Sequence, residues 1–262
     1  MALTEKILST GPRPPGSQGI EKARATIRSE ISAMGFSPME QAFSASTPVG
    51  TIEMVNLSYV IEGKKHAKKA LLVAHYDSKR MDFPFLGAND AASSVALLLS
   101  LSPAIRDLAL PFDVEIVFVD GEEALVDWSP TDSLYGSRHY VSTLSVPSIA
   151  AAIVVDMVGD ADLSLIRSAR SAPNLVESMA EVLDGIGRKD VLEKNTLDVE
   201  DDHVPFADAG IPVLHLMDFR YGGTLTPGTY WHTKEDTLDR LSASSLSIVG
   251  RVILGVLASL SA

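Results

Sequence analysis

Short apolar runs alternate with stretches of helical spacing along most of the chain. The apolar runs fall at residues 70–74, 114–119, 151–155 and 212–216. Apolar residues at helical spacing fall between and after these runs, at 91–101, 134–144, 175–186 and 246–260. Strands that alternate with helices build a largely parallel sheet, because a parallel connection needs a crossover element. The pattern therefore predicts buried parallel strands with helices on both faces of the sheet.

The N-terminal part of the chain carries a different pattern. Residues 11–19 are rich in Pro and Gly and predict a loop. Apolar residues from Ile20 to Met34 follow helical spacing, and Gly35 ends that helix. Residues 55–61 read as a half-buried strand. Since no linker or repeat divides the sequence, we expect one α/β domain over residues 1–262, with a central twisted, mostly parallel mixed sheet.

The composition limits the chemistry that the chain can carry. The formal net charge of −12 leaves no basic excess to neutralise phosphates, so we expect no nucleic-acid partner. The sequence contains no cysteine, so any metal must be held by His, Asp and Glu. No apolar run is long enough to span a bilayer, and we expect no membrane partner. Residues 1–15 show no secretory signal, which predicts a cytoplasmic protein, or a periplasmic or secreted one if a signal is removed.

Polar residues stand where each of three buried strands ends. The first run leads into His75 and Asp77, the second into Glu122 and Glu123, and the third into Asp156. Ligands of open α/β sheets bind outside the carboxyl ends of the strands. One such residue would carry little weight, but three strands that deliver carboxylates or imidazole to one edge predict a site.

The strand that ends in His75 and the turn after it each allow two interpretations. In the H-x-D pair, residues two apart point the same way, so Asp77 is placed to orient a metal-binding His75. The alternative is a core histidine with no ligand. Asp90 precedes a predicted helix, and taken alone it is better explained as an N-cap.

The carboxylates after the next two strands are also ambiguous when taken singly. Glu122 and Glu123 are neighbours that point in different directions, so one can bind a metal while the other acts as general acid or base. A solvated pair in a loop is the alternative. Asp156 ends an apolar strand, where an unpaired carboxylate is costly, so it belongs to a hydrogen-bond network or a metal site.

Further candidates lie toward the C-terminus and beside the two tryptophans. His232 completes a ligand set, and Asp201 belongs to a compact polar cluster that precedes the last predicted strand. His215, inside that strand, is interpreted as a buried structural imidazole. Trp128 and Trp231 flank candidate site residues and predict an apolar wall for a substrate, although core packing is their usual role.

The types of candidate ligand indicate which metal the site would hold. Mixed His and carboxylate ligands with a spare carboxylate suit a catalytic zinc ion that keeps an open position. Manganese and cobalt are compatible with the same ligands.

These motifs occur in the chain in the order H-x-D (75–77), N-D (89–90), E-E (122–123), Asp156 and His232. This order resembles the order of the metal-site motifs in the metallopeptidases of the M28 family. Within that family, several segments resemble the animal-type glutaminyl-peptide cyclotransferases, or glutaminyl cyclases. These segments are GPRPPGS (11–17), AHYDSK (74–79), VDGEEALVDWSPTDSLYGSRH (119–139), EDDHVPFADAGIPVLHL (200–216) and WHT (231–233). The similarity runs from about residue 11 to the last helix, and the 119–139 stretch is the most specific.

This resemblance implies a zinc exopeptidase-like fold and one zinc ion per chain, held by Asp90, Glu123 and His232. It implies substrates with an N-terminal Gln, which an acyltransferase of this type cyclises to pyroglutamate with release of ammonia. Peptides or proteins with such an N-terminus are the implied partners, and we expect a monomer.

The resemblance also implies roles for the remaining candidates. Glu122 would be the proton shuttle, in a hydrogen-bonded network with Asp156 and Asp201. Trp128 and Trp231 would line the pocket that takes the glutaminyl side chain. The lack of cysteine and of a visible signal fits a bacterial relative better than a secreted animal enzyme.

Two alternatives to the cyclase remain. An M28-type zinc aminopeptidase would use His75 and Asp156 at a second metal position, which the cyclases normally leave unfilled, and would hydrolyse the N-terminal residue. A non-catalytic interaction domain is disfavoured, because every ligand and the shuttle glutamate are present. Residues 218–230, longer here than the usual loop before WHT, are expected to border the pocket.

Overall fold

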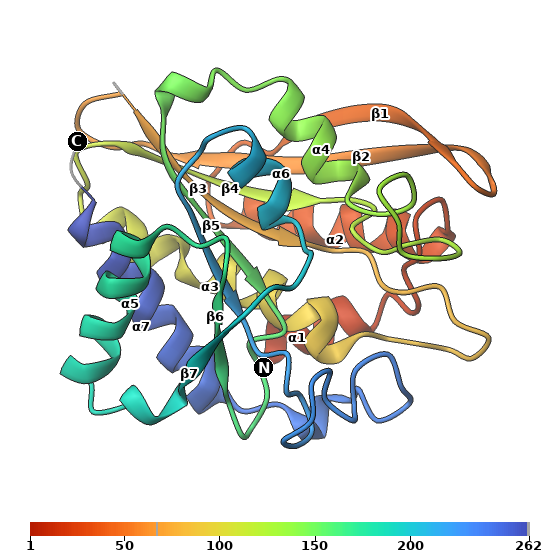
Figure 1. Cartoon of the computed structure of the whole chain (residues 1–262). Helices are drawn as coiled ribbons and strands as arrows, with labels where there is room; N and C mark the ends of the chain where they lie inside the picture. Colours follow the sequence, from red (N-terminus) through yellow and green to blue (C-terminus); the bar gives the residue numbers. More distant parts are fainter. Residues whose placement is uncertain (67, 261–262) are drawn as a thin grey trace.

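A six-stranded mixed sheet forms the centre of the protein, with the strands in the order β1-β2-β4-β3-β5-β8 (Figure 1). The computed structural model describes residues 1–66 and 68–260. β3, β4, β5 and β8 run parallel, whereas β2 is antiparallel to both β1 and β4. The strands of this sheet are β1 (Met39–Thr47), β2 (Gly50–Ile61), β3 (Lys69–His75), β4 (Asp113–Val119), β5 (Ile149–Asp156) and β8 (Val213–Met217).

Helices cover both faces of this sheet, and β6 and β7 form a separate small parallel sheet in which β6 packs against β8. The remaining elements are α1 (Ala2–Leu8), α2 (Gln18–Ala33), the π-helical segment η1 (Ala88–Ser93), α3 (Ser94–Asp107), α4 (Tyr135–Ser142), β6 (Leu165–Ser168), α5 (Pro173–Gly185), β7 (Leu192–Leu197), α6 (His203–Asp208), α7 (Ala243–Ser259) and the short 3₁₀ helices η2 (Val146–Ser148), η3 (Lys189–Val191) and η4 (Leu238–Arg240).

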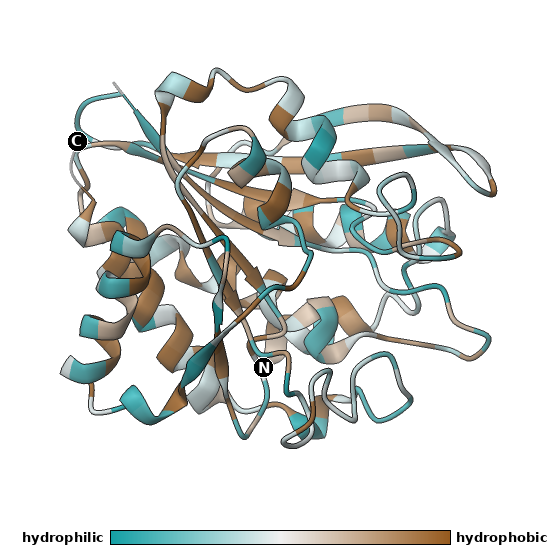
Figure 2. Ribbon diagram, in the orientation of Figure 1, coloured by the Kyte–Doolittle hydropathy of each residue, from teal (hydrophilic) through white to brown (hydrophobic). Residues whose placement is uncertain are grey.

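Alternate residues of the central strands face two different hydrophobic layers. On β3, Leu72 packs with α1, α2, α3, α5 and α7 in the larger core, whereas Leu71 and Val73 pack with α4 and α6 in the smaller one. This alternation follows from the two-residue period of a strand, and the strands read as continuous apolar runs because both faces are covered. Figure 2 shows these strands as hydrophobic through the middle of the molecule, with hydrophilic residues on the outer helix faces.

The chain changes direction across the sheet at β3. From β3, the crossover through α3 leads to β4 on one side, and the crossover through α4 leads on to β5, which pairs with β3 on its other side. Such a reversal opens a crevice at the carboxyl ends of the strands. His75 is the last residue of β3 and Asp156 the last of β5, so the fold itself brings them to this crevice.

The predicted fold class is confirmed, and the four predicted parallel strands, the predicted strand at 55–61 and the five predicted helices are all present. The pattern did not predict β1, β6, β7, α1 or α6. β1 is largely exposed, so it lacks a buried face that would leave an apolar pattern, and α6 has only six residues. Each helix among the described residues is too short or too polar to cross a membrane.

Candidate active site

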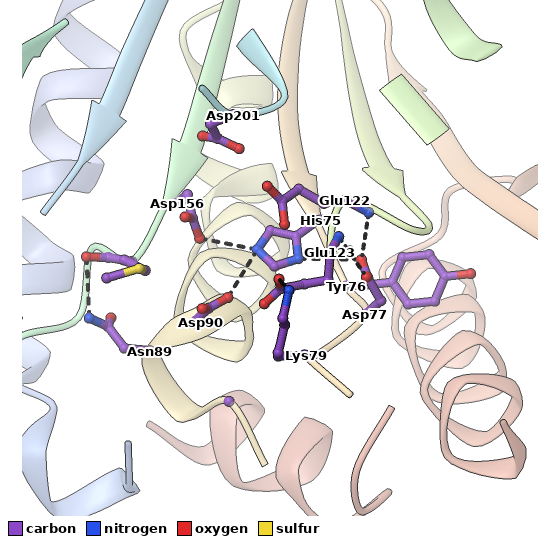
Figure 3. A network of polar contacts seen from close by, with 12 residues as sticks. His75, Tyr76, Asp77, Lys79, Asn89, Asp90, Glu122, Glu123, Asp156 and Asp201 are labelled. Carbon is purple, nitrogen blue, oxygen red and sulfur yellow. Dashed lines mark hydrogen bonds and ion pairs between the residues drawn. The ribbon is translucent and has the colours of Figure 1, made fainter. Parts of the chain in front are cut away.

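His75 lies at the centre of a buried group of carboxylates (Figure 3). Its Nε2 is 3.2 Å from Asp156 Oδ1 and 3.3 Å from Asp90 Oδ1, and its Nδ1 is 3.3 Å from Asp77 Oδ1. Burial alone would lower the pKa of His75, but Asp156, Asp77 and Asp90 outweigh it and raise that pKa well above its usual value. His75 is therefore more than a passive core histidine, since it joins three acidic side chains.

Asp77 connects this histidine to the loop after β4. Its Oδ1 accepts from the backbone N–H of Glu122 and its Oδ2 from that of Glu123, both at 3.2 Å (Figure 3). The placement expected for the second residue of the H-x-D pair is present. Asp77 thus fixes both the His75 ring and the directions in which the two glutamates leave the backbone.

Glu123 and His232 join Asp90 in a second group of possible metal ligands, on the side that faces a cavity. His232 Nε2 lies 2.9 Å from Glu123 Oε1 and 3.1 Å from Asp90 Oδ2. One ligand atom from each residue falls within 4.8 Å of the other two, the spacing that a shared ion would need. Burial would lower the pKa of His232, but Glu123 and Asp90 raise it to about 10. Two carboxylates and one imidazole fit a zinc ion with an open position.

Asp90 belongs to both groups and does not cap a helix. Its Oδ1 faces His75 and its Oδ2 faces His232, while Gly87 occupies the N-cap position of η1. The N-cap interpretation that Asp90 invited on its own is therefore wrong. The reason is that the chain at Asp90 and Ala91 departs from helical dihedral angles, so the carboxylate turns toward the imidazoles.

The backbone of His232 adopts an unusual conformation that its neighbours stabilise. Its φ of 53° is in the left-handed region, which costs free energy for a residue with a side chain. Trp231 stacks on the His232 ring at 3.9 Å between centroids, and Phe85 meets the same ring edge-on at 5.9 Å. Strained residues that are held by their surroundings cluster at functional sites, which agrees with the position of His232 beside the cavity.

Glu122 is buried, with 7 % of its surface exposed, and its side chain lines the same cavity. Burial raises the pKa of Glu122 well above its usual value; His75 opposes this shift, whereas Glu123 and Asp201 add to it. Within the described part of the chain, its carboxylate accepts no hydrogen bond and forms no ion pair. A carboxylate in this position is free to exchange a proton with a bound molecule.

The hydrogen-bonded network expected around Glu122 has a different form in the structure. Asp156 pairs with His75, and Asp201 Oδ2 lies 2.5 Å from His215 Nε2. Burial would raise the pKa of Asp201, but His215 outweighs it and lowers that pKa to about 2. Asp201 therefore acts on Glu122 through its nearby charge while it is engaged by His215, and Asp156 is engaged by His75 (Figure 3).

His215 belongs to a buried polar cluster and is not an isolated structural imidazole. It is fully buried on β8, pairs with Asp201 and stacks on His203 at 4.0 Å between ring centroids. His203 Nε2 lies 3.2 Å from Ser168 Oγ, so the cluster also reaches β6. The group anchors the start of α6, and with it the segment that carries Asp201.

The loop that carries Trp128 is shaped by one acidic side chain. Asp132 accepts hydrogen bonds from the backbone N–H groups of Leu125, Val126 and Asp127 at 2.9–3.0 Å. Burial would raise the pKa of Asp132, but these hydrogen bonds outweigh it and lower that pKa. The Asp132 carboxylate thus explains part of the specific 119–139 motif: it folds the loop that places an indole at the cavity.

A cavity of about 360 Å³ brings together the three residues predicted to hold the zinc ion, Glu122 and both tryptophans. Asp201 and His75 lie outside its lining. Its lining residues are Lys79, Asp90, Glu122, Glu123, Trp128, Asp156, Val199, Glu200, Met217, Phe219, Trp231 and His232. Sequence reasoning did not single out Lys79, Val199, Glu200, Met217 or Phe219. Phe219 belongs to the 218–230 loop, so this loop borders the cavity as expected.

A buried arginine from the N-terminal loop supports the segment before Asp90. Arg13 is fully buried, and its guanidinium donates to the carbonyls of Tyr76, Leu86 and Gly87 at 2.6–3.3 Å. Burial lowers the pKa of Arg13 to about 10, against the opposing effect of Asp77 and other acids. The GPRPPGS segment therefore holds the turn that presents Asp90.

Arg13→Lys is expected to lower the free energy of unfolding by about 1–2 kcal/mol, because an ammonium replaces the planar fork that serves three carbonyls. For a domain of this size, that corresponds to a Tm lower by about 2–8 °C in a thermal melt. Arg28→Lys is the matched control, since Arg28 forms an exposed pair with Glu40 and should shift the Tm by much less. Equal shifts in the two variants would contradict the structural role of Arg13.

Comparison with known proteins agrees with this geometry. The sequence pattern of peptidase family M28 matches residues 56–257. The chain belongs to this family. The glutaminyl-peptide cyclotransferase-like protein of Mus musculus is 30 % identical to it, over 94 % of this chain and 71 % of the relative.

Solved structures of bacterial proteins resemble this M28 family member along almost its whole length. An Acidobacteriales bacterium glutaminyl cyclase has a TM-score of 0.91 and 38 % identity, covering 98 % of this chain and 91 % of that one. The Fimbriiglobus ruber glutaminyl cyclase has a TM-score of 0.87 and 25 % identity, covering 98 % and 93 %. The resemblance to glutaminyl cyclases is confirmed, and bacterial proteins are among the similar structures.

Proposed function

We propose that this protein is a zinc-dependent glutaminyl-peptide cyclotransferase that converts an N-terminal Gln to pyroglutamate and releases ammonia. The observation that carries the proposal is one cavity that holds a three-donor metal set, a free buried carboxylate and two tryptophans. Relatives and solved structures that bear the cyclase name match almost the whole chain.

Asp90, Glu123 and His232 would hold the zinc ion, one per chain. When bound, zinc would supply a Lewis acid beside the γ-carbonyl oxygen of the substrate. The donor set fits this ion by chemistry, since zinc accepts imidazole and carboxylate ligands, and all three residues line the cavity. In the group around His75, the carboxylates of Asp156 and Asp90 would remain paired with the His75 imidazole and would hold no ion of their own.

Glu122 would carry the proton that the reaction must move. The α-amino nitrogen of the substrate forms a bond to its own γ-carbonyl carbon, and the bond from that carbon to the amide nitrogen breaks. Glu122 would take a proton from the α-amine and return one to the leaving nitrogen, which departs as ammonia. No water enters the products of this reaction.

Trp128 and Trp231 would hold the substrate in the coiled shape that ring closure needs. Trp231 is fixed by stacking on His232 and by an edge contact with Phe219 at 5.4 Å. Since nucleophile and electrophile belong to one substrate molecule, holding them together supplies much of the rate advantage. Peptides and proteins with an exposed N-terminal Gln are the proposed partners, and the chain is proposed to act as a monomer.

The test follows the mass of a peptide that begins with Gln after incubation with zinc-loaded protein. Loss of one ammonia with no free amino acid is the expected result. Release of free Gln would sink the proposal and support the aminopeptidase alternative. The same peptide with an acetylated N-terminus is the control, because it has no free amine to attack, and it should remain unchanged.

A further inference from the structure

Glu200 is a lining residue of the cavity that the proposed reaction does not use. It lies between β7 and α6, directly before Asp201, and its side chain is exposed to solvent. Its Oε2 accepts a hydrogen bond from Trp128 Nε1 at 2.9 Å, so two loops that are far apart in the sequence meet at this point. The hydrogen bond fixes one carboxylate oxygen and leaves Oε1 available to another group.

The charge of Glu200 is not compensated, unlike that of the cavity carboxylates that touch a basic group. Asp90 contacts both His75 and His232, and Asp156 contacts His75. Glu123 contacts His232 and also Lys79 Nζ, at 3.3 Å. Glu200 forms no ion pair with any residue from 1–66 or 68–260, so a negative charge remains at the solvent side of the cavity.

The position of Glu200 coincides with the path that a bound peptide must take. The N-terminal residue has to reach Glu122 and the donor set, which are buried. The following residues would leave through the exposed part of the lining, which includes Trp128, 38 % exposed, and Glu200 beside it. A peptide bound in this way would place the residue after the N-terminal one near the free oxygen of Glu200.

We propose that Glu200 forms a subsite for a basic side chain, so that the protein favours N-terminal glutaminyl peptides with Lys or Arg directly after the Gln. The proposal rests on the proposed cyclase function and deepens it by naming the substrate class. A Lys ammonium or Arg guanidinium would donate to Glu200 Oε1, while a Glu at the same place would meet like charge. Val199 and Phe219 line the cavity as well and suit the aliphatic stem of such a side chain.

The experiment compares kcat/KM for two peptides of equal length that begin Gln-Lys and Gln-Glu. An exposed ion pair contributes modestly, so we expect a preference for Gln-Lys of about 3- to 10-fold at low salt, mainly in KM, which shrinks as salt is added. Glu200→Gln keeps an oxygen that accepts from the Trp128 indole but removes the charge. In this variant the preference should fall to within about 2-fold.

The control separates a local effect from that of the overall net charge of −12. Asp198→Asn changes the net charge equally, and Asp198 is exposed on the same segment but does not line the cavity. This control should keep the wild-type preference. An equal loss of preference in both variants, or no preference in the wild type, would overturn the subsite.

Measurements of peptide binding test the subsite independently of catalytic turnover. Quenching of tryptophan fluorescence gives the Kd of the zinc-loaded protein for the dipeptide amides Gln-Lys and Gln-Glu. If no ammonia is released but Gln-Lys binds more tightly and Glu200→Gln removes the difference, the proposed function fails while the subsite stands. If ammonia is released and both amides bind equally in wild type and variant, the subsite fails and the proposed function stands.

Discussion

Glu122→Gln is expected to lower kcat for a glutaminyl peptide by about 100- to 10,000-fold, the range that general acid–base catalysis supplies. The amide has nearly the shape of the carboxylate but cannot take a proton from the α-amine. The Glu122 side chain forms no hydrogen bond or ion pair with His232, Asp90 or Glu123 that the change would break, and the hydrogen bond from its backbone N–H to Asp77 remains. Ammonia release gives the rate, and elemental analysis of the dialysed protein should give the same zinc content as the wild type.

The neighbouring glutamate supplies the matched control. Glu123→Gln replaces a proposed zinc ligand that contacts His232 at 2.9 Å, so it should lose zinc as well as activity. Loss of zinc in Glu122→Gln, or a near-normal rate in that variant with zinc present, would show that the roles of the two glutamates are wrongly assigned.

The central sheet and the edge that carries the site were predictable because burial leaves a strong pattern. β3, β4, β5 and β8 are covered on both faces and read as apolar runs, and their last residues include His75 and Asp156. β1 could not be found in this way, since almost all of its residues are partly or fully exposed. β6 and β7 are short, and β7 carries three exposed residues in a row, so neither leaves a clear period.

The role of a site residue was predictable where its residue type limits what it can bind. It was not predictable where the role depends on which side chains pair in three dimensions. His232, Asp90 and Glu123 are types that bind metal, and they do converge. The pairing of Asp201 with His215 depends on how α6 and β8 pack, which no local pattern encodes. Lys79 and Glu200 belong to the segments 74–79 and 200–216 that resemble glutaminyl cyclases, but the type of a charged loop residue does not show that it faces a cavity.

The cavity also shows why Asp90 was ambiguous in the sequence. An Asp before a helix usually caps it, and only the three-dimensional arrangement of His75 and His232 around its two oxygens gives it another role. The two histidines that contact Asp90 differ in their access to the cavity. His232 lines the cavity, whereas His75 is 1 % exposed and does not belong to the lining. This difference leads to a prediction about the number of metal ions.

His232→Ala is expected to weaken zinc binding by more than about 100-fold, since loss of a ligand should exceed the 10- to 100-fold cost of losing an outer hydrogen-bond partner. His75→Ala should instead leave one tightly held zinc ion per chain, because Asp90, Glu123 and His232 all remain beside the cavity. Competition with a fluorescent chelator measures the zinc Kd, and elemental analysis counts the ions. His139→Ala is the control for loss of an imidazole, as His139 stacks on Phe43 and belongs to neither donor set.

The two histidine variants also decide between the cyclase arrangement and a two-metal peptidase arrangement. If the wild type holds one ion and only His232→Ala loses it, His75 acts as the partner of Asp156 and Asp90 and not as a ligand. If the wild type holds two ions and His75→Ala loses one of them, the buried group around His75 is a second metal site. That result would favour hydrolysis, because an ion there could deliver an activated water to the substrate, whereas ring closure needs none.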